Sequence, residues 1–216
     1  MGIGSAGISL TPRKTPKLTV GEIFGSQKIA MEDSIEEPAP EEMEAGEEQA
    51  EESGYPLSGK VLELVNAQYN KEEFSSQTYY ALSAYFADIK LEGFAQYFRK
   101  AAVEEHDHAM KFFDYMIKCN VLIKPIPMDA PKTDFESPKA ACNFFLKHEQ
   151  EVTRLINSIA DAAMTAKDFY TFGFINWFLS EQLEEVRKAE DLSKKMELVA
   201  DDAGSLLLVD MEMKED

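Results

Sequence analysis

Four glutamates lie within apolar patterns that are otherwise typical of helices facing a protein core. Apolar residues recur every three or four positions in residues 65–86, 94–119, 142–163 and 175–192, a spacing that places them on one helix face. The carboxylates within these faces are Glu72, Glu105, Glu149 and Glu185. A buried carboxylate must be protonated, paired with a cation or bound to a metal ion, because burying it alone costs several kcal/mol. No Lys or Arg lies on the four faces, so a divalent cation is the simplest counter-charge.

One of these glutamates is followed by a histidine at helical spacing. Glu105 and His108 are three residues apart, so a carboxylate oxygen and an imidazole nitrogen lie on the same side of the helix. Such a pair can bind one metal ion together. The sequence therefore predicts a metal site inside a bundle of helices.

Four long helices must position these side chains, and the sequence predicts them over residues 58–89, 94–118, 138–166 and 168–198. Ser58 and Ser137 are suited to cap two of them, and Pro138 fits a first helical turn. Residues 121–137 contain three prolines and cannot be helical throughout, but they are long enough to cross a bundle. We therefore predict an all-α four-helix bundle with a long crossover between the second and third helices. A short apolar segment at 204–213 should pack on this bundle or on neighbouring subunits.

Composition restricts the function further. The 216 residues carry a formal charge of -18, and 44% of them are hydrophobic, which suits one folded domain with a long appendage. Such acidity argues against a nucleic-acid partner and is compatible with attraction of cations, although a solvated acidic surface is the alternative explanation. No apolar run reaches the roughly 18 residues of a membrane helix, so no membrane partner is expected. The two cysteines, Cys119 and Cys142, predict neither a disulfide framework nor a zinc site.

The N-terminal part differs in composition from the rest. Residues 1–30 hold four basic residues against one acid, Glu22, which is typical of an organelle transit peptide or of an unstructured tail. Residues 31–52 are rich in acids and contain no Lys or Arg, as in a solvated linker. We therefore divide the chain into an extension, 1–54, and a helical domain, 55–216.

Several short motifs in the helical domain resemble the non-haem ferritin family. They are Glu72 with Tyr79, Glu105-His106-Asp107-His108, Glu149, and Ser180-Glu181-Gln182-Leu183-Glu184-Glu185. The stretches 148–150, 162–165 and 174–182 are similar to the bacterial-type members. The resemblance covers essentially everything after Tyr55, and it implies a ferritin-like bundle with a short C-terminal fifth helix.

The resemblance also implies a ferroxidase centre with two irons. The first iron would bind Glu72, Glu105 and His108. Glu105 would bridge to a second iron held by Glu149, with Gln182 and Glu185 completing its surroundings and Tyr79 beside the pair. A third iron site would use Glu104, Glu181 and Glu184, for which the alternative is an acidic inner surface that merely attracts iron. Because His106 stands where bacterioferritins have a haem-ligating methionine, no haem is expected.

The implied function is storage and detoxification of iron. Hard oxygen ligands with one imidazole suit Fe(II) and stabilise Fe(III) more, which favours oxidation by O2 or peroxide. The product would be stored as a ferric mineral inside a homo-oligomeric shell of 24 subunits. One alternative is a di-iron oxidase or peroxidase that stores no mineral, and another is a purely structural bundle.

Two further expectations concern location and packing. The basic and then acidic extension resembles that of plastid ferritins of algae or plants, so we expect a plastid location, with the cytoplasm as the alternative. Trp177 is expected to pack in the core.

Overall fold

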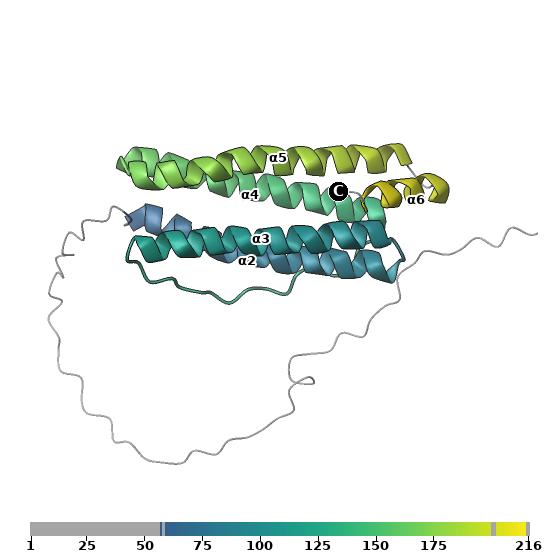
Figure 1. The fold of residues 1–216 in the computed structure, drawn as a ribbon, viewed down its shortest axis with the longest axis horizontal. Coiled ribbons are helices and arrows are strands. Elements are labelled where there is room, and N and C mark those ends of the chain that lie inside the picture. The colour runs from purple at the N-terminus through teal and green to yellow at the C-terminus, as the bar shows by residue number, and fades with distance from the viewer. Residues whose placement is uncertain (1–56, 58, 200–201, 215–216) are drawn as a thin grey trace, which may run out of the picture. The chain divides into compact units, whose positions relative to one another are not determined.

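A computed structural model describes residue 57, residues 59–199 and residues 202–214 of the chain (Figure 1). The predicted extension, its boundary at residue 54 and its targeting role lie outside these residues. The described part contains five helices and no strand. None of these helices combines the length and the apolar character needed to cross a membrane.

The helices pair as two antiparallel hairpins that pack into a four-helix bundle (Figure 1). One hairpin consists of α2 (Gly59–Asp88) and α3 (Glu92–Lys118), and the other of α4 (Pro138–Ala166) and α5 (Phe169–Val199). The segment between α3 and α4 runs along the outside of the first hairpin, so α4 begins at the same end of the bundle as α3. The predicted fold class is confirmed, and every predicted helix limit lies within two residues of the observed one.

Local signals account for several helix ends. The Ser137 hydroxyl accepts a hydrogen bond from the Ala140 amide at 3.1 Å, and Pro138 lies in the first turn, as predicted. Lys167 ends α4 in the left-handed conformation, with φ of 56°. The predicted cap Ser58 lies outside the described residues.

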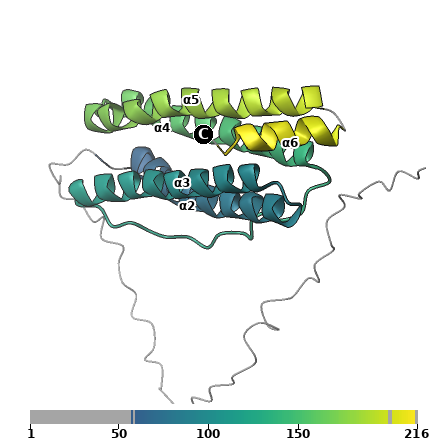
Figure 2. The ribbon, with the colours of Figure 1, turned by 45° about the vertical axis from the view of Figure 1, so that its right-hand side comes forward.

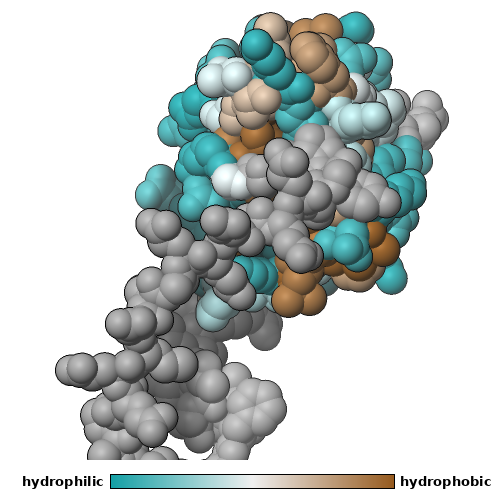
Figure 3. Space-filling view, turned by 90° about the vertical axis from the view of Figure 1, so that its left-hand side faces the viewer, coloured by the Kyte–Doolittle hydropathy of each residue, from teal (hydrophilic) through white to brown (hydrophobic). Residues whose placement is uncertain are grey.

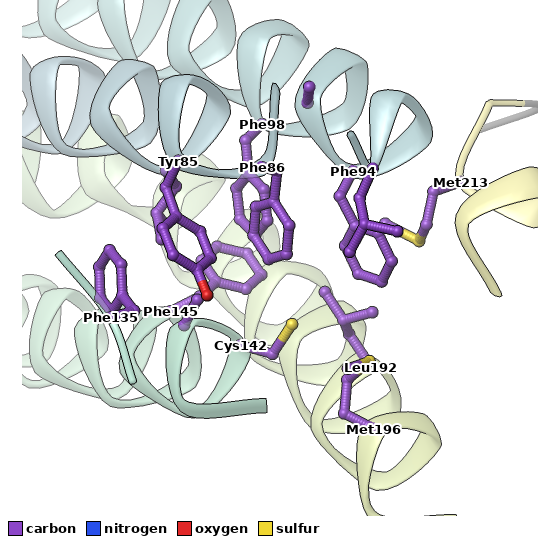
Figure 4. Packing of buried hydrophobic residues seen from close by; sticks show 14 of the residues in the cluster. Tyr85, Phe86, Phe94, Phe98, Phe135, Cys142, Phe145, Leu192, Met196 and Met213 are labelled. Carbon is purple, nitrogen blue, oxygen red and sulfur yellow. The ribbon is translucent and has the colours of Figure 1, made fainter. Parts of the chain in front are cut away.

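Two hydrophobic clusters fill the bundle, one near each end. The first is rich in aromatic rings and includes Phe86, Phe94, Phe98 and Phe145 (Figure 4). The second, nearer the α4–α5 turn, includes Val65, Phe112, Ile156 and Phe178. On that end of the molecule, hydrophobic areas are separated by hydrophilic ones (Figure 3). Because one cluster lies toward each end of the bundle, the polar residues between them are enclosed from both ends.

Two asparagines of α2 hold the crossover against the first hairpin. The Asn66 side chain accepts from the Lys124 amide at 2.8 Å and donates to the Lys124 carbonyl at 3.0 Å. The Asn70 side chain accepts from the Ile126 amide at 2.9 Å and donates to the Lys124 carbonyl at 3.2 Å. These bonds satisfy backbone groups in a segment that has no regular structure of its own.

We expect Asn70→Ala to destabilise the protein by about 0.5–1.5 kcal/mol, because it removes the hydrogen bond to the amide of Ile126, an exposed residue. Asn157→Ala, at an exposed position of α4, is the control and should change stability by less than about 0.5 kcal/mol. Denaturant unfolding with hydrogen exchange at Ile126 measures both effects. Equal stability and unchanged exchange at Ile126 would show that the crossover does not depend on Asn70.

The fifth helix, α6 (Ala203–Glu212), lies at one end of the bundle, between α5 and the start of α3 (Figures 1 and 2). Asp210 is buried there, and its carboxylate accepts a hydrogen bond from the Phe94 amide at 3.0 Å. Val209 and Met213 pack on the aromatic cluster, whereas Leu207, Leu208 and Met211 are exposed. The segment thus packs on its own bundle with one face and leaves an apolar face uncovered in the single chain.

Gly93 allows this close packing, since a Cβ there would lie 1.7 Å from the Asp210 carbonyl oxygen. We expect Gly93→Ala to cost about 1–3 kcal/mol through overpacking and to loosen α6. Gly173→Ala on α5, where a Cβ meets nothing within 4 Å, should instead stabilise by up to about 1 kcal/mol. Denaturant unfolding compares the two, and effects of the same sign would contradict this view of α6.

Candidate metal centre

Between the two hydrophobic clusters, each of the four long helices places polar side chains in the interior of the bundle. The predicted site residues that are buried there are Glu72, Tyr79, Glu105, His108, Glu149, Gln182 and Glu185. Each helix continues for at least two turns on either side of its polar residues. The polar side chains are therefore held by regular helices, which set their positions accurately.

Glu72, Glu105 and His108 form the tightest group. One ligand atom from each residue lies within 4.8 Å of the others, and His108 Nδ1 is 3.8 Å from Glu105 Oε2. Glu72 Oε1 accepts a hydrogen bond from Gln68 at 2.8 Å, whereas the buried Glu72 Oε2 has no hydrogen-bond partner. An unsatisfied buried carboxylate oxygen beside a second carboxylate and an imidazole fits the ligand set of a divalent cation.

The protonation of this group reflects its burial. Burial raises the pKa of Glu72 well above its usual range, and the nearby Glu105 raises it further. Burial also raises the pKa of Glu105 to about 7. The pKa of His108 is lowered by burial, which keeps the ring neutral and able to bind a metal ion. Without a cation, the carboxyl groups therefore retain protons that a bound cation would displace.

Glu149 lies outside this three-residue group and has its own partners. Tyr79 donates its phenolic hydrogen to the Glu149 carboxylate, and Gln182 Nε2 donates to Glu149 Oε2 at 3.1 Å. Burial raises the pKa of Glu149 to about 8, and the Gln182 hydrogen bond opposes that rise. The structure thus joins Tyr79, Glu149 and Gln182, three residues that the sequence predicted together.

Glu185 corrects one part of the sequence argument. Its buried carboxylate pairs with Lys188 Nζ at 2.8 Å. Lys188 is absent from the apolar face but lies three residues further along α5, and its long side chain reaches back. The expectation that no side-chain cation balances the inner carboxylates was therefore wrong for Glu185.

The three glutamates predicted for a third site lie nearer the surface. Glu104 and Glu184 are exposed, and Glu181 is partly buried. Glu104 and Glu181 line a surface pocket of about 230 Å³ together with His108, and Glu184 is not among the lining residues. The structure thus brings two of the three glutamates to one opening beside His108.

Trp177 lines the same pocket and corrects another expectation. Its side chain is 41% exposed rather than packed in the core. Lys111 Nζ lies 4.3 Å from the centre of one face of the indole, and the His108 ring meets the indole edge-on with centroids 5.4 Å apart. The cation–π contact favours this partly exposed position of the indole, and a helical apolar spacing cannot signal such a contact.

Three further residues beside the site were not predicted from the sequence. Gln68 hydrogen-bonds Glu72, and its spacing of four residues on the same helix was an available signal. Ser75 and His148 form a buried hydrogen bond of 2.7 Å between α2 and α4. Burial lowers the pKa of His148 to about 3. No spacing rule pairs Ser75 with His148, because they are far apart in the chain.

Comparisons with known proteins agree with this arrangement. The family model for the ferritin-like domain matches residues 62–199. A bacterial non-heme ferritin of Staphylococcus haemolyticus is 37% identical over 159 residues, which cover 73% of this chain and 95% of the relative. The corresponding protein of Staphylococcus aureus is 36% identical over 157 residues, with coverage of 73% and 95%.

Solved structures show the same similarity. An open pore ferritin from the archaeon Archaeoglobus fulgidus superposes with a TM-score of 0.73 at 35% identity, covering 74% of this chain and 98% of that one. A humanized archaeal ferritin superposes with a TM-score of 0.72 at 36% identity, with coverage of 74% and 98%.

Proposed function

Because this chain belongs to the ferritin family, we propose that it stores iron and oxidises Fe(II) at the buried carboxylates of its bundle. One observation carries the proposal. Glu72, Glu105 and His108 converge in an enclosed space, and a buried oxygen of Glu72 has no hydrogen-bond partner. Without a cation, a proton shared with Glu105 can satisfy that oxygen. A bound cation would replace the proton and engage both carboxylates.

The proposal comprises two iron positions. A first Fe(II) binds Glu72, Glu105 and His108, which lie on α2 and α3. A second binds between Glu105 and Glu149, where Gln182 and Glu185 complete the surroundings. Two adjacent Fe(II) supply the two electrons that reduce O2 to H2O2, or H2O2 to water. Tyr79 stays beside the pair as a hydrogen-bond donor to Glu149 or as an electron donor.

Glu104, Glu181 and Glu184 are proposed as a third iron site beside this centre. Support comes from the pocket that Glu104 and Glu181 share with His108, because a cation in that pocket would lie next to a ligand of the first iron. Lys111 and Lys188 line the same pocket, but Glu104, Asp107 and Glu181 outnumber them, so the net charge there still favours cations.

We further propose that the chain assembles into a homo-oligomeric shell of 24 subunits in which the ferric product mineralises. The exposed leucines of α6, Leu207 and Leu208, support assembly, since an uncovered apolar face is commonly an interface. Sedimentation of the full-length chain tests this directly. A small oligomer with two bound irons per chain would favour a di-iron oxidase or peroxidase without storage.

The oxidation chemistry is tested by anaerobic Fe(II) titration followed by exposure to O2. We expect about two irons per chain to oxidise rapidly, as in di-iron bundles. His108→Ala should lose this phase, whereas His106→Ala should keep it, since His106 is exposed and pairs with Glu73 at 3.3 Å. Loss of the phase in both variants, or in neither, would contradict the assignment of His108.

A further inference from the structure

Ser75 and His148 form a buried polar contact that the proposed iron site does not use directly. Ser75 Oγ and His148 Nε2 are 2.7 Å apart, and both residues are buried. Ser75 belongs to α2 and His148 to α4, so the contact joins the two hairpins of the bundle.

The His148 ring is enclosed by three aromatic rings. It meets Tyr79 edge-on, with centroids 5.5 Å apart, and it lies 6.3 Å from both Phe74 and Phe144. These neighbours come from α2 and α4. A ring packed in this way, with its Nε2 engaged by Ser75, has little freedom to change rotamer.

This contact lies one helical turn from the contact that holds Glu149. Ser75 precedes Tyr79 by four residues on α2, and His148 immediately precedes Glu149 on α4. Tyr79 in turn donates to the Glu149 carboxylate. Two hydrogen bonds, one turn apart on α2 and on consecutive residues of α4, thus fix how far α4 is shifted along α2 and how it is rotated.

The two proposed iron positions depend differently on this alignment. Glu72, Glu105 and His108 come only from α2 and α3. Glu149 is the ligand that α4 supplies, and its place relative to Glu105 depends on how α4 lies against the first hairpin. A change in how α4 packs on α2 should therefore weaken binding of the second ion and leave binding of the first ion unchanged.

We propose that Ser75 and His148 are positioning residues that place Glu149 for the second metal ion. The inference rests on the proposed function, because it assigns Glu149 to that ion. Neither residue is proposed as a ligand. Removing a residue that hydrogen-bonds a metal ligand commonly changes metal affinity by about 10–100-fold. Ser75 and His148 act one contact further away, through Tyr79 and the packing of α4, so the expected effect is the lower end of that range.

Anaerobic titration with Co(II), a redox-inert probe followed by calorimetry and visible absorption, tests this inference. Ser75→Ala removes the hydroxyl, and the double variant Ser75→Ala/His148→Phe removes the bond while keeping a ring and no unpaired polar atom. Both should bind the first Co(II) as the unaltered protein does and the second about tenfold more weakly. Ser83→Ala is the matched control, since Ser83 makes an equally long bond of 2.7 Å from α2 to the Ala95 carbonyl. It should leave both affinities unchanged.

The outcomes separate the two proposals. Suppose that the unaltered chain binds two Co(II). If the variants then bind both ions with the same affinities, or if their affinities for the two ions fall equally, Ser75 and His148 do not position Glu149. If the unaltered chain itself fails to bind two Co(II), the proposed function is overturned as well. Unfolding curves for each variant confirm that the comparison is made on folded protein.

Discussion

Glu105→Gln is expected to abolish iron oxidation and, at the same time, to stabilise the metal-free protein. The amide has almost the same shape as the carboxylate but cannot bridge two cations, so the oxidation rate should fall by at least about 100-fold. Burial holds the pKa of Glu105 at about 7. Its ionisation therefore costs up to about 3 kcal/mol at alkaline pH, and the amide avoids that cost.

Glu197→Gln provides the control, because Glu197 is exposed on α5 and its neutralisation should change stability by less than about 0.5 kcal/mol. Denaturant unfolding at pH 8 in the presence of a chelator gives the stability of each protein, and stopped-flow oxidation gives the rate. A Glu105→Gln protein that is less stable than the unaltered chain and still oxidises iron would contradict both parts of the expectation.

The metal-free protein should also lose stability as the pH rises from about 6.5 to 8.5. Burial raises the pKa of Glu105 to about 7 and that of Glu149 to about 8. In this range the folded state binds more protons than the unfolded state, where such carboxyls titrate near 4.5. The contribution of these two carboxyl groups to the free energy of unfolding is therefore fully present below the unfolded pKa. It falls as the pH rises through the folded pKa values, by about 3 kcal/mol over this window.

Buried histidines set the lower limit of that window. The pKa of His148 is lowered to about 3 and that of His108 is lowered as well, so below about pH 6.5 these rings favour the unfolded state, which can take up their protons. Above pH 6.5 the histidine effect fades as the unfolded rings lose their protons, and the carboxyl effect is the larger of the two.

Denaturant midpoints measured across the window check this expectation. Saturating Zn(II) should flatten the dependence, because the cation replaces the protons, and Glu105→Gln/Glu149→Gln should flatten it without metal. Stability that rises with pH over this range in the metal-free protein would show that the inner carboxyl groups are ionised at little cost.

Helix positions were predictable from the sequence because the signals are local. Ser137 and Pro138 mark the start of α4, and the apolar spacing defines the inner face of each helix. Glu105 and His108 were predictable as partners for the same reason, since a helix dictates how residues three apart lie. The position of Glu72 beside them was predicted only through the family resemblance, because this contact joins two different helices.

The contacts that sequence reasoning missed depend on tertiary packing or on long side chains. Ser75 meets His148 only after the two hairpins have packed. Lys188 reaches Glu185 from the edge of its helix, and Lys111 lies over the exposed indole of Trp177. A pattern of apolar positions records which residues face the core, but it does not record which flexible side chains fold back onto it.

Crystals of the full-length protein soaked with Fe(II) without oxygen, and measured at the iron absorption edge, test the central claim most directly. We predict an anomalous peak between Glu72, Glu105 and His108 in each subunit and a second between Glu105 and Glu149. Iron confined to exposed carboxylates, with no peak inside the bundle, would contradict the claim that these buried residues bind iron.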